Sequence, residues 1–368
     1  MERKVILEEA KAVCIKASKK PLILLGAGAN RKEARRAISD FINKTKIPFC
    51  NTQMGKGSVD ESSDYFLGTA ALSDKDYLHD YIRAADLIIN IGHDVVEKPP
   101  FFMEHGGASV IHINYKSAQV DQVYFPQVEV IGDIALSMDA LADCFALDTS
   151  FALDKFYQVR DLVRNMTTAS LEDISFPPKP QHLVAQIRQS MGYHDIITLD
   201  NGVYKIWFAR NYPAFQPNTI LLDNALATMG AGLPSAMTAA MLYPNRKVMA
   251  ICGDGGFMMN SQELETAVRL KLNLVVLILN DSSYGMIRWK QAGMGFKDWG
   301  LEYDNPDFSM YAKSYGVTPH KIHENDSIPL VIDEAFKAGG VHLIDLPVDY
   351  TDNVKDLISD LAKHEPVI

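Results

Sequence analysis

Two aspartates, Asp254 and Asp281, each follow an apolar run that has the composition of a buried strand. In residues 248–257 the run ends in Gly-Asp-Gly-Gly, and in residues 274–284 a second run ends in Asn-Asp. The amphipathic segment between the runs has a helical pattern, so the sequence predicts two strands joined by a crossover helix. The ends of parallel strands meet at one edge of a sheet, and both carboxylates are therefore expected to face one ligand.

The residues around Asp254 indicate what that ligand is. Gly255 and Gly256 have no side chains to block a close approach, and backbone amides after a strand are good phosphate donors. A carboxylate beside them would repel a phosphate unless a divalent cation lay between, and Mg²⁺ prefers oxygen ligands together with a diphosphate. An isolated Gly-Asp-Gly-Gly is equally typical of a plain strand-to-turn connection. The helix and the second strand favour a metal-bridged diphosphate site.

Residues 253–281, GDGGFMMNSQELETAVRLKLNLVVLILND, resemble the signature of thiamin-diphosphate-dependent enzymes. Their QELETA segment, residues 262–267, is most similar to the catalytic (large) subunits of acetolactate synthases. The resemblance implies that Asp254, Asp281 and the backbone carbonyl of Ser283 hold Mg²⁺. The family usually has Asn at the position of Asp281, and an aspartate oxygen is also a competent Mg²⁺ ligand.

Three further segments resemble the same family. Residues 223–234 resemble its LGTMGxGLPAA element, which implies that Met229 supports a bent cofactor; the alternative is a gap-filling core methionine. Residues 202–204, GVY, lie where the family has a Gly-Gln-His element that touches the diphosphate, so only Gly202 matches it, and Tyr204 is either a hydroxyl donor or a packing residue. Trp289 lies one position early in a GMVxQW-like segment that selects the second 2-oxoacid. The resemblance thus implies cofactor contacts at Gly202, Met229, Gly253, Gly255, Gly256, Ser283, Tyr284, Gly285 and Met286, metal ligands at Asp254, Asp281 and Ser283, and a substrate contact at Trp289.

Strand-like runs alternate with helical patterns along the whole chain, which predicts an α/β fold with two doubly wound domains and mainly parallel sheets. We expect a central Rossmann-like domain at residues 1–148, a linker at 149–180 that ends in Phe-Pro-Pro-Lys-Pro, and a diphosphate-binding domain at 181–368. Helices are also expected at residues 7–19 and at the C-terminus. Gly26-Ala27-Gly28 is more typical of a tight turn than of a nucleotide site.

Two polar segments outside the diphosphate unit raise separate questions of function. The first domain resembles the family's central domain, which carries FAD in acetolactate synthases. The family segment that helps hold FAD contains arginines, whereas the corresponding residues 91–100 have none, so the sequence does not decide whether this chain binds FAD. His93, Asp94 and Glu97 are expected to be solvated rather than to bind metal. Asn260 and Glu263 are expected to form a helix N-cap box.

The composition excludes several classes of function. A chain of 368 residues with 47% hydrophobic and 22% charged residues is typical of a globular protein with two domains. The net charge of -10 excludes a nucleic-acid-binding surface. Four cysteines without CxxC spacing argue against a zinc cluster and predict buried free thiols in a reducing compartment. No apolar run reaches membrane-spanning length, so a cytoplasmic protein is expected.

The resemblance also implies what the chain needs from elsewhere. In the family, a glutamate from the N-terminal pyrimidine domain of a neighbouring subunit activates the cofactor, and no glutamate here matches it. A domain of about 150 residues is therefore expected to be absent from the front of the chain, which alone would be inactive. This implies no catalytic residue in this chain, a homo-oligomer (dimer or tetramer), and either a truncation or a separate chain that carries the pyrimidine domain.

The expected reaction is that of an acetolactate synthase in branched-chain amino-acid biosynthesis. Such an enzyme uses thiamin diphosphate and Mg²⁺ to decarboxylate pyruvate and to join the two-carbon unit to a second 2-oxoacid. Two alternatives remain at this point. The chain could belong to another thiamin-diphosphate decarboxylase or carboligase, or it could be a non-catalytic diphosphate-binding remnant.

Overall fold

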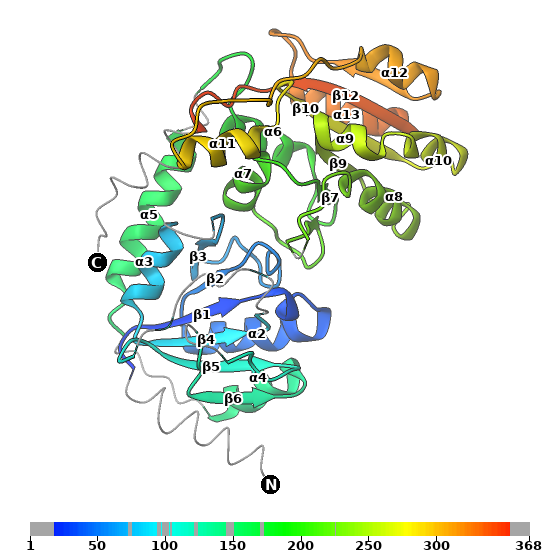
Figure 1. The fold of residues 1–368 in the computed structure, drawn as a ribbon. Coiled ribbons are helices and arrows are strands. Elements are labelled where there is room, and N and C mark those ends of the chain that lie inside the picture. Colours follow the sequence, from blue (N-terminus) through cyan, green and yellow to red (C-terminus); the bar gives the residue numbers. More distant parts are fainter. Residues whose placement is uncertain are drawn as a thin grey trace. The chain divides into compact units, whose positions relative to one another are not determined.

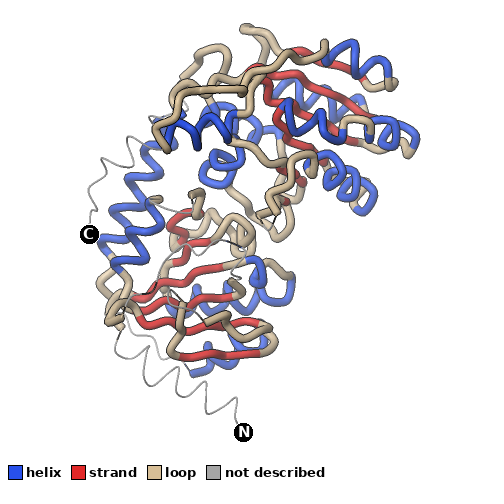
Figure 2. The backbone as a smooth tube through the Cα atoms, viewed as in Figure 1, coloured by secondary structure: helices blue, strands red, loops and turns tan. Residues whose placement is uncertain are grey.

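The computed structural model describes residues 18–72, 76–93, 97, 103, 105–120, 124–144, 151–169, 173–224 and 226–353. The chain divides into two compact units (Figure 1). Of the described residues, those within 18–166 and 213–218 form the first unit, and those within 167–212 and 219–353 form the second. Figure 2 shows that each unit contains one sheet with helices beside it, which confirms the predicted α/β class.

The sheet of the first unit is parallel throughout, in the order β3-β2-β1-β4-β5-β6. Its central strands β1 and β4 are buried at every residue, as expected for strands covered on both faces. The sequence did not predict β3, a short strand whose residues alternate between buried and half-buried. The strands are β1 (Pro21–Leu25), β2 (Phe49–Asn51), β3 (Phe66–Thr69), β4 (Leu87–Ile91), β5 (Ser109–Asn114) and β6 (Val128–Ile131).

Helices α2 and α4 pack against each other in the first unit. Helix α2 buries apolar residues at helical spacing, among them Ala34, Ile38 and Phe41, and ends at Lys46, which has a left-handed φ of 61°. The helices are η2 (Ala27–Ala29), α2 (Lys32–Thr45), α3 (Tyr77–Ala84), α4 (Ile134–Cys144) and α5 (Asp154–Ala169). Helix α5 lies within the residues for which the sequence predicted a linker.

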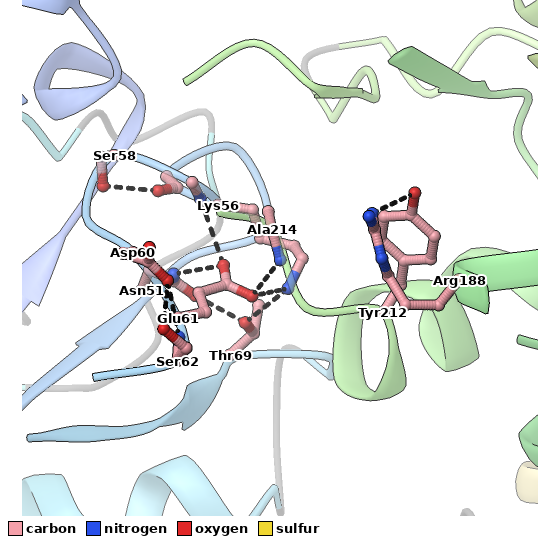
Figure 3. Close-up of polar contacts among 12 residues, drawn as sticks. Asn51, Lys56, Ser58, Asp60, Glu61, Ser62, Thr69, Arg188, Tyr212 and Ala214 are labelled. Atoms are coloured by element: carbon pink, nitrogen blue, oxygen red, sulfur yellow. Dashed lines mark hydrogen bonds and ion pairs between the residues drawn. The ribbon is translucent and has the colours of Figure 1, made fainter. Parts of the chain in front are cut away.

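A buried ion pair joins the loops at one end of this sheet (Figure 3). Lys56 Nζ lies 2.8 Å from Glu61 Oε2, and the two side chains are only 2% and 1% exposed. The Glu61 carboxylate also accepts hydrogen bonds from Asn51 Nδ2 at 2.9 Å and from the Ala214 amide at 2.9 Å. Lys56 donates a second bond to Thr69 Oγ1 at 3.1 Å. Both charges are therefore compensated, as buried charges must be.

The glycine turn after β1 holds an internal carboxylate. The Ala27 amide donates to both oxygens of Glu97, at 2.9 and 3.0 Å. Glu97 and His93 are both buried, so the prediction that they are solvated was wrong. Within the described residues, no cluster of three or more His, Cys, Asp or Glu side chains is arranged to hold a metal. Asp94 and most of the segment 91–100 lie outside those residues.

The second unit has a parallel sheet in the order β11-β12-β10-β9-β7-β8. Strand β8 pairs with one edge of β7, and the next strand, β9, pairs with the other edge. Where the direction of strand addition reverses in this way, a crevice forms at the carboxyl ends of the strands. The strands are β7 (Ile196–Leu199), β8 (Ile220–Leu221), β9 (Val248–Gly253), β10 (Leu274–Asn280), β11 (Thr318–Lys321) and β12 (Val341–Pro347). The helices are α6 (Pro180–Ser190), α7 (Tyr204–Asn211), α8 (Gly232–Leu242), α9 (Asp254–Asn260), α10 (Glu263–Arg269), α11 (Gly285–Gly293), α12 (Phe308–Ser314) and α13 (Ile328–Ala338).

Several composition-based expectations concern single features of the fold. Cys50 and Cys252 are buried free thiols, as predicted, whereas Cys14 and the side chain of Cys144 lie outside the described residues. The same holds for most of the helix expected at residues 7–19 and for the chain after residue 353. No helix in the described ranges is both long and apolar enough to cross a membrane.

Candidate functional site

The carboxyl ends of β7, β9 and β10 lie side by side and border a cavity. The strand register pairs Ile251 with both Leu199 and Leu277, so the loops that follow begin at one level of the sheet. Every cofactor and metal residue that the sequence predicted lines this cavity. The lining residues are Asn201, Gly202, Val203, Tyr204, Met229, Gly253, Asp254, Gly255, Gly256, Leu279, Asp281, Ser283, Tyr284, Gly285, Met286, Ile287, Tyr303 and Tyr350.

Asp254 is the first residue of α9 and is 1% exposed. Its Oδ1 accepts a hydrogen bond from the Tyr303 hydroxyl at 2.8 Å. Its Oδ2 accepts from the Ser282 amide at 2.7 Å and from Asn305 Nδ2 at 2.6 Å. These donors stabilise a buried negative charge at the centre of the cavity wall.

Asp281 lies at the end of β10 beside that charge. Burial, and then the negative charge of Asp254, raise the pKa of Asp281 to about 7, although Arg288 acts in the opposite direction. Two neighbouring carboxylates of this kind would suit a divalent cation, because the cation would remove their repulsion. The donor set of Asp254, Asp281 and the Ser283 carbonyl consists of oxygen atoms only and fits Mg²⁺.

Replacing Asp281 with asparagine is expected to stabilise the metal-free protein at pH 8 but not near pH 4. Between about pH 4 and pH 7 the folded protein keeps a proton on Asp281 that the unfolded chain releases, so a rise in pH through this window destabilises the fold. The asparagine side chain has no proton to lose, and we expect a gain of about 4 kcal/mol at pH 8. Urea unfolding in EDTA at pH 4, 6 and 8 measures this gain, and a difference that is equal at all three pH values contradicts it.

Several buried hydroxyl groups on the cavity wall lack an acceptor. The hydroxyls of Tyr350 and Ser283 have no hydrogen-bond partner among the described residues, and the Tyr204 hydroxyl meets only the backbone of Gly253 there, which leaves its proton without an acceptor. Burial, followed by the nearby Asp200 carboxylate, raises the pKa of Tyr204 well above its ordinary value, so its hydroxyl stays protonated and able to donate. Unsatisfied buried donors are costly and therefore indicate a ligand with acceptor atoms. A diphosphate has such acceptors.

Asp200 holds the loop that carries Met229. Its Oδ1 accepts from the Gly230 amide at 2.8 Å and from the Ala231 amide at 3.2 Å. Asn201 Nδ2 donates to the Thr228 carbonyl at 2.8 Å. The loop that holds Met229 against the cavity is thus fixed from both sides.

The two glycines after Asp254 serve the protein's own packing. A Cβ atom on Gly256 would lie 2.5 Å from Asp200 Oδ2, and one on Gly255 would lie 2.6 Å from the Tyr303 hydroxyl. The Gly255 amide donates to Asp254 Oδ1 at 2.9 Å. The sequence explained these glycines by close approach of a ligand, whereas the close approaches in the structure are to Asp200 and Tyr303.

Not every sequence prediction falls at this cavity. Trp289 lies on α11 outside the lining, with Lys290 Nζ 4.5 Å from its ring centroid. The N-cap box of Asn260 and Glu263 was wrong, because Asn260 ends α9 and its Nδ2 donates to the Gly230 carbonyl at 2.8 Å. Sequence reasoning missed Tyr303, Asn305 and Tyr350, since none of them belongs to a spaced motif.

Two family profiles match the chain. Residues 200–346 match the C-terminal TPP binding domain of thiamine pyrophosphate enzymes, and residues 9–141 match the central domain of thiamine pyrophosphate enzymes. Both lie where the sequence and the sheets indicate separate α/β units.

Curated relatives include three acetolactate synthases. The acetolactate synthase of Bacillus subtilis is 31% identical over 95% of this chain and 62% of its own length. The catabolic acetolactate synthase of Raoultella terrigena is 30% identical over 93% of this chain and 62% of its own length. The acetolactate synthase isozyme 2 large subunit of Escherichia coli is 29% identical over 98% of this chain and 66% of its own length. The chain thus spans less than two thirds of each of these relatives.

Proposed function

The chain belongs to the thiamine pyrophosphate enzymes, and we propose that it provides the diphosphate and Mg²⁺ site of an acetolactate-synthase-like enzyme. The observation that carries the proposal is the cavity at the ends of β7, β9 and β10. Its wall combines two mutually repelling carboxylates, Asp254 and Asp281, with the unpartnered donors Tyr204 and Tyr350. The relatives named as acetolactate synthases support the choice of reaction.

Each part of the cavity has a proposed task. Asp254, Asp281 and the Ser283 carbonyl would hold Mg²⁺, while the Tyr204 hydroxyl would donate to the diphosphate. Met229 would support the cofactor between its two rings. When bound, thiamin diphosphate supplies a nucleophilic carbon that attacks a 2-oxoacid and stabilises the two-carbon unit left after decarboxylation. The protein's own share is to bind, to orient and to exclude water.

The activating glutamate is proposed to come from outside this chain's cavity. Among the described residues, no glutamate lines the cavity. A pyrimidine-binding domain, on a longer form of the chain or on a separate chain, would supply that group across an oligomer interface. The proposed substrates are pyruvate and a second 2-oxoacid. FAD is not part of the proposal. The Ala27 amide in the glycine turn, which an anionic dinucleotide would need as a donor, already donates hydrogen bonds to the Glu97 carboxylate.

Complementation tests the proposed reaction. The 368-residue protein is assayed for acetolactate from pyruvate with Mg²⁺ and thiamin diphosphate, alone and after mixing with a purified pyrimidine domain of an acetolactate synthase. Activity only in the mixture supports the proposal. If the protein binds the cofactor but neither sample is active with pyruvate or with any other 2-oxoacid, the non-catalytic alternative is favoured instead.

Tyr204→Phe is expected to have opposite effects on stability and on cofactor binding. Removing a buried hydroxyl whose proton has no acceptor leaves the stability of the cofactor-free protein unchanged or slightly higher. The affinity for thiamin diphosphate falls about tenfold, as the loss of one charge-assisted hydrogen bond predicts. Thermal unfolding without ligand and calorimetric titration with the cofactor measure the two effects. Unchanged affinity would mean that Tyr204 only packs.

A further inference from the structure

Residues 301–305, which we call the clamp segment, lie between α11 and α12, and no sequence motif pointed to them. Their role at the metal site, argued below, rests on the proposed function. The clamp segment contacts the loop after β10, which contains Asp281 and the Ser283 carbonyl. Its two polar anchors are Tyr303 and Asn305, and both are half-buried.

Backbone hydrogen bonds hold the clamp segment antiparallel to residues 282–284. The Tyr284 amide donates to the Leu301 carbonyl at 3.0 Å, and the Tyr303 amide donates to the Ser282 carbonyl at 3.2 Å. Ser283 and Glu302 form an isolated antiparallel bridge between these two bonds. The Ser283 peptide is thus fixed on one side by the clamp segment.

The loop that the clamp segment holds is strained. Ser282 has a left-handed φ of 50°, which a serine rarely adopts. A residue in such a conformation persists only where its surroundings determine it, and such residues occur often at ligand sites. This turn sets the direction of the neighbouring Ser283 carbonyl, so the two backbone bonds to the clamp segment bear directly on a proposed metal ligand.

The side chains of the clamp segment contact Asp254. The Tyr303 hydroxyl donates to Asp254 Oδ1 at 2.8 Å and lies 3.4 Å from the Ser283 carbonyl oxygen. Asn305 Nδ2 donates to Asp254 Oδ2 at 2.6 Å and to Asn280 Oδ1 at 3.0 Å. Both carboxylate oxygens of Asp254 are therefore oriented by the clamp segment.

The Tyr303 hydroxyl bridges two proposed ligands, because it lies within hydrogen-bond distance of both the Asp254 carboxylate and the Ser283 carbonyl oxygen.

From these contacts we propose that Tyr303 and Asn305 are positioning residues of the metal centre. They bridge the carboxylate of Asp254 to the Ser283 carbonyl and to the end of β10, and so preorganise the ligand set before the cation binds. Gly255 supports this assignment, because any side chain there would displace the Tyr303 hydroxyl. Residues that orient metal ligands typically contribute about 10–100-fold to metal affinity, and we expect a contribution of that size from the clamp segment.

The test is a titration of the 368-residue protein with Mn²⁺ in place of Mg²⁺, followed by electron paramagnetic resonance, with and without thiamin diphosphate. Tyr303→Phe and Asn305→Ala are expected to weaken Mn²⁺ binding about 10–100-fold and to change the spectrum of the bound ion. The matched control is Tyr311→Phe, because the Tyr311 hydroxyl bonds Ser261 away from the cavity at 2.7 Å. Urea unfolding in EDTA of all variants separates lost stability from lost affinity.

The outcomes separate the positioning role from the proposed function. The positioning role is overturned if both clamp variants bind Mn²⁺ with wild-type affinity. It is also overturned if Tyr303→Phe binds Mn²⁺ more tightly, which would mean that the hydroxyl competes with the cation for Asp254. A wild type that binds Mn²⁺ but not thiamin diphosphate overturns the proposed function alone. A wild type that binds no Mn²⁺ overturns both.

Discussion

Asp254→Asn is expected to abolish Mg²⁺-dependent binding of thiamin diphosphate, with a loss of affinity of at least about 100-fold. The variant keeps the size of the side chain but removes the negative charge that a divalent cation requires. It also places an amide NH₂ where the carboxylate now accepts hydrogen bonds from Tyr303, Asn305 and the Ser282 amide. With the Gly255 amide, four donors would lose a charged acceptor, and at least one would face another donor.

The measurement for Asp254→Asn is thermal unfolding with and without Mg²⁺ and thiamin diphosphate. Wild type is expected to gain stability in the presence of both, and the variant is expected to gain none. Asp195→Asn is a matched control, because Asp195 also accepts backbone amides, from Gly192 and Lys247, but lies at the opposite end of β7. An equal ligand-induced shift in wild type and Asp254→Asn would remove Asp254 from the metal site.

The second large effect is expected in the first unit, at Glu61. Glu61→Ala leaves the Lys56 ammonium buried without its counter-charge and leaves the donors Asn51 Nδ2 and the Ala214 amide without an acceptor. Breaking a buried ion pair by removing one partner costs about 3–5 kcal/mol. We expect this loss in urea unfolding, together with faster hydrogen exchange of the amides in β1 and β2.

Two further variants separate this effect from ordinary loss of contacts. The double variant Lys56→Met with Glu61→Leu is expected to recover only the part of the loss that comes from the uncompensated Lys56 charge, because Asn51 Nδ2 and the Ala214 amide stay without an acceptor. Asp139→Ala, which removes a pair with the exposed Arg36 on the surface, is expected to cost less than about 1 kcal/mol. A Glu61→Ala protein as stable as Asp139→Ala would show that the buried pair contributes little.

The parallel sheets and the place of the cavity were predictable because the relevant patterns are local. Strands β9 and β10 are apolar runs that lead directly into polar residues, Asp254 after β9 and Asn280-Asp281 at the end of β10. Adjacent parallel strands bring such ends to one edge whatever the rest of the chain does. The cavity therefore contains the predicted cofactor and metal residues, whereas their roles in binding stay predictions.

The remaining parts of the site depend on contacts distant in sequence. Tyr303 and Asn305 belong to an irregular segment with no repeating pattern, and only the backbone bonds to residues 282–284 bring them to Asp254. The burial of His93 and Glu97 depends in the same way on the packing of the glycine turn after β1. Strand β3 was missed because it has only four residues, one of them Gly68, and so short a segment shows no strand pattern in the sequence.

The metal-bridged diphosphate site is tested by calorimetric titration of the 368-residue protein with thiamin diphosphate, once in Mg²⁺ and once in EDTA. We expect one binding site per chain in Mg²⁺, weaker binding of pyrophosphate at the same site, and no binding in EDTA. Thiamin without phosphates is expected not to bind in either buffer. Equal affinity for the cofactor in Mg²⁺ and EDTA, or no binding in either, would contradict a metal-bridged diphosphate site at Asp254 and Asp281.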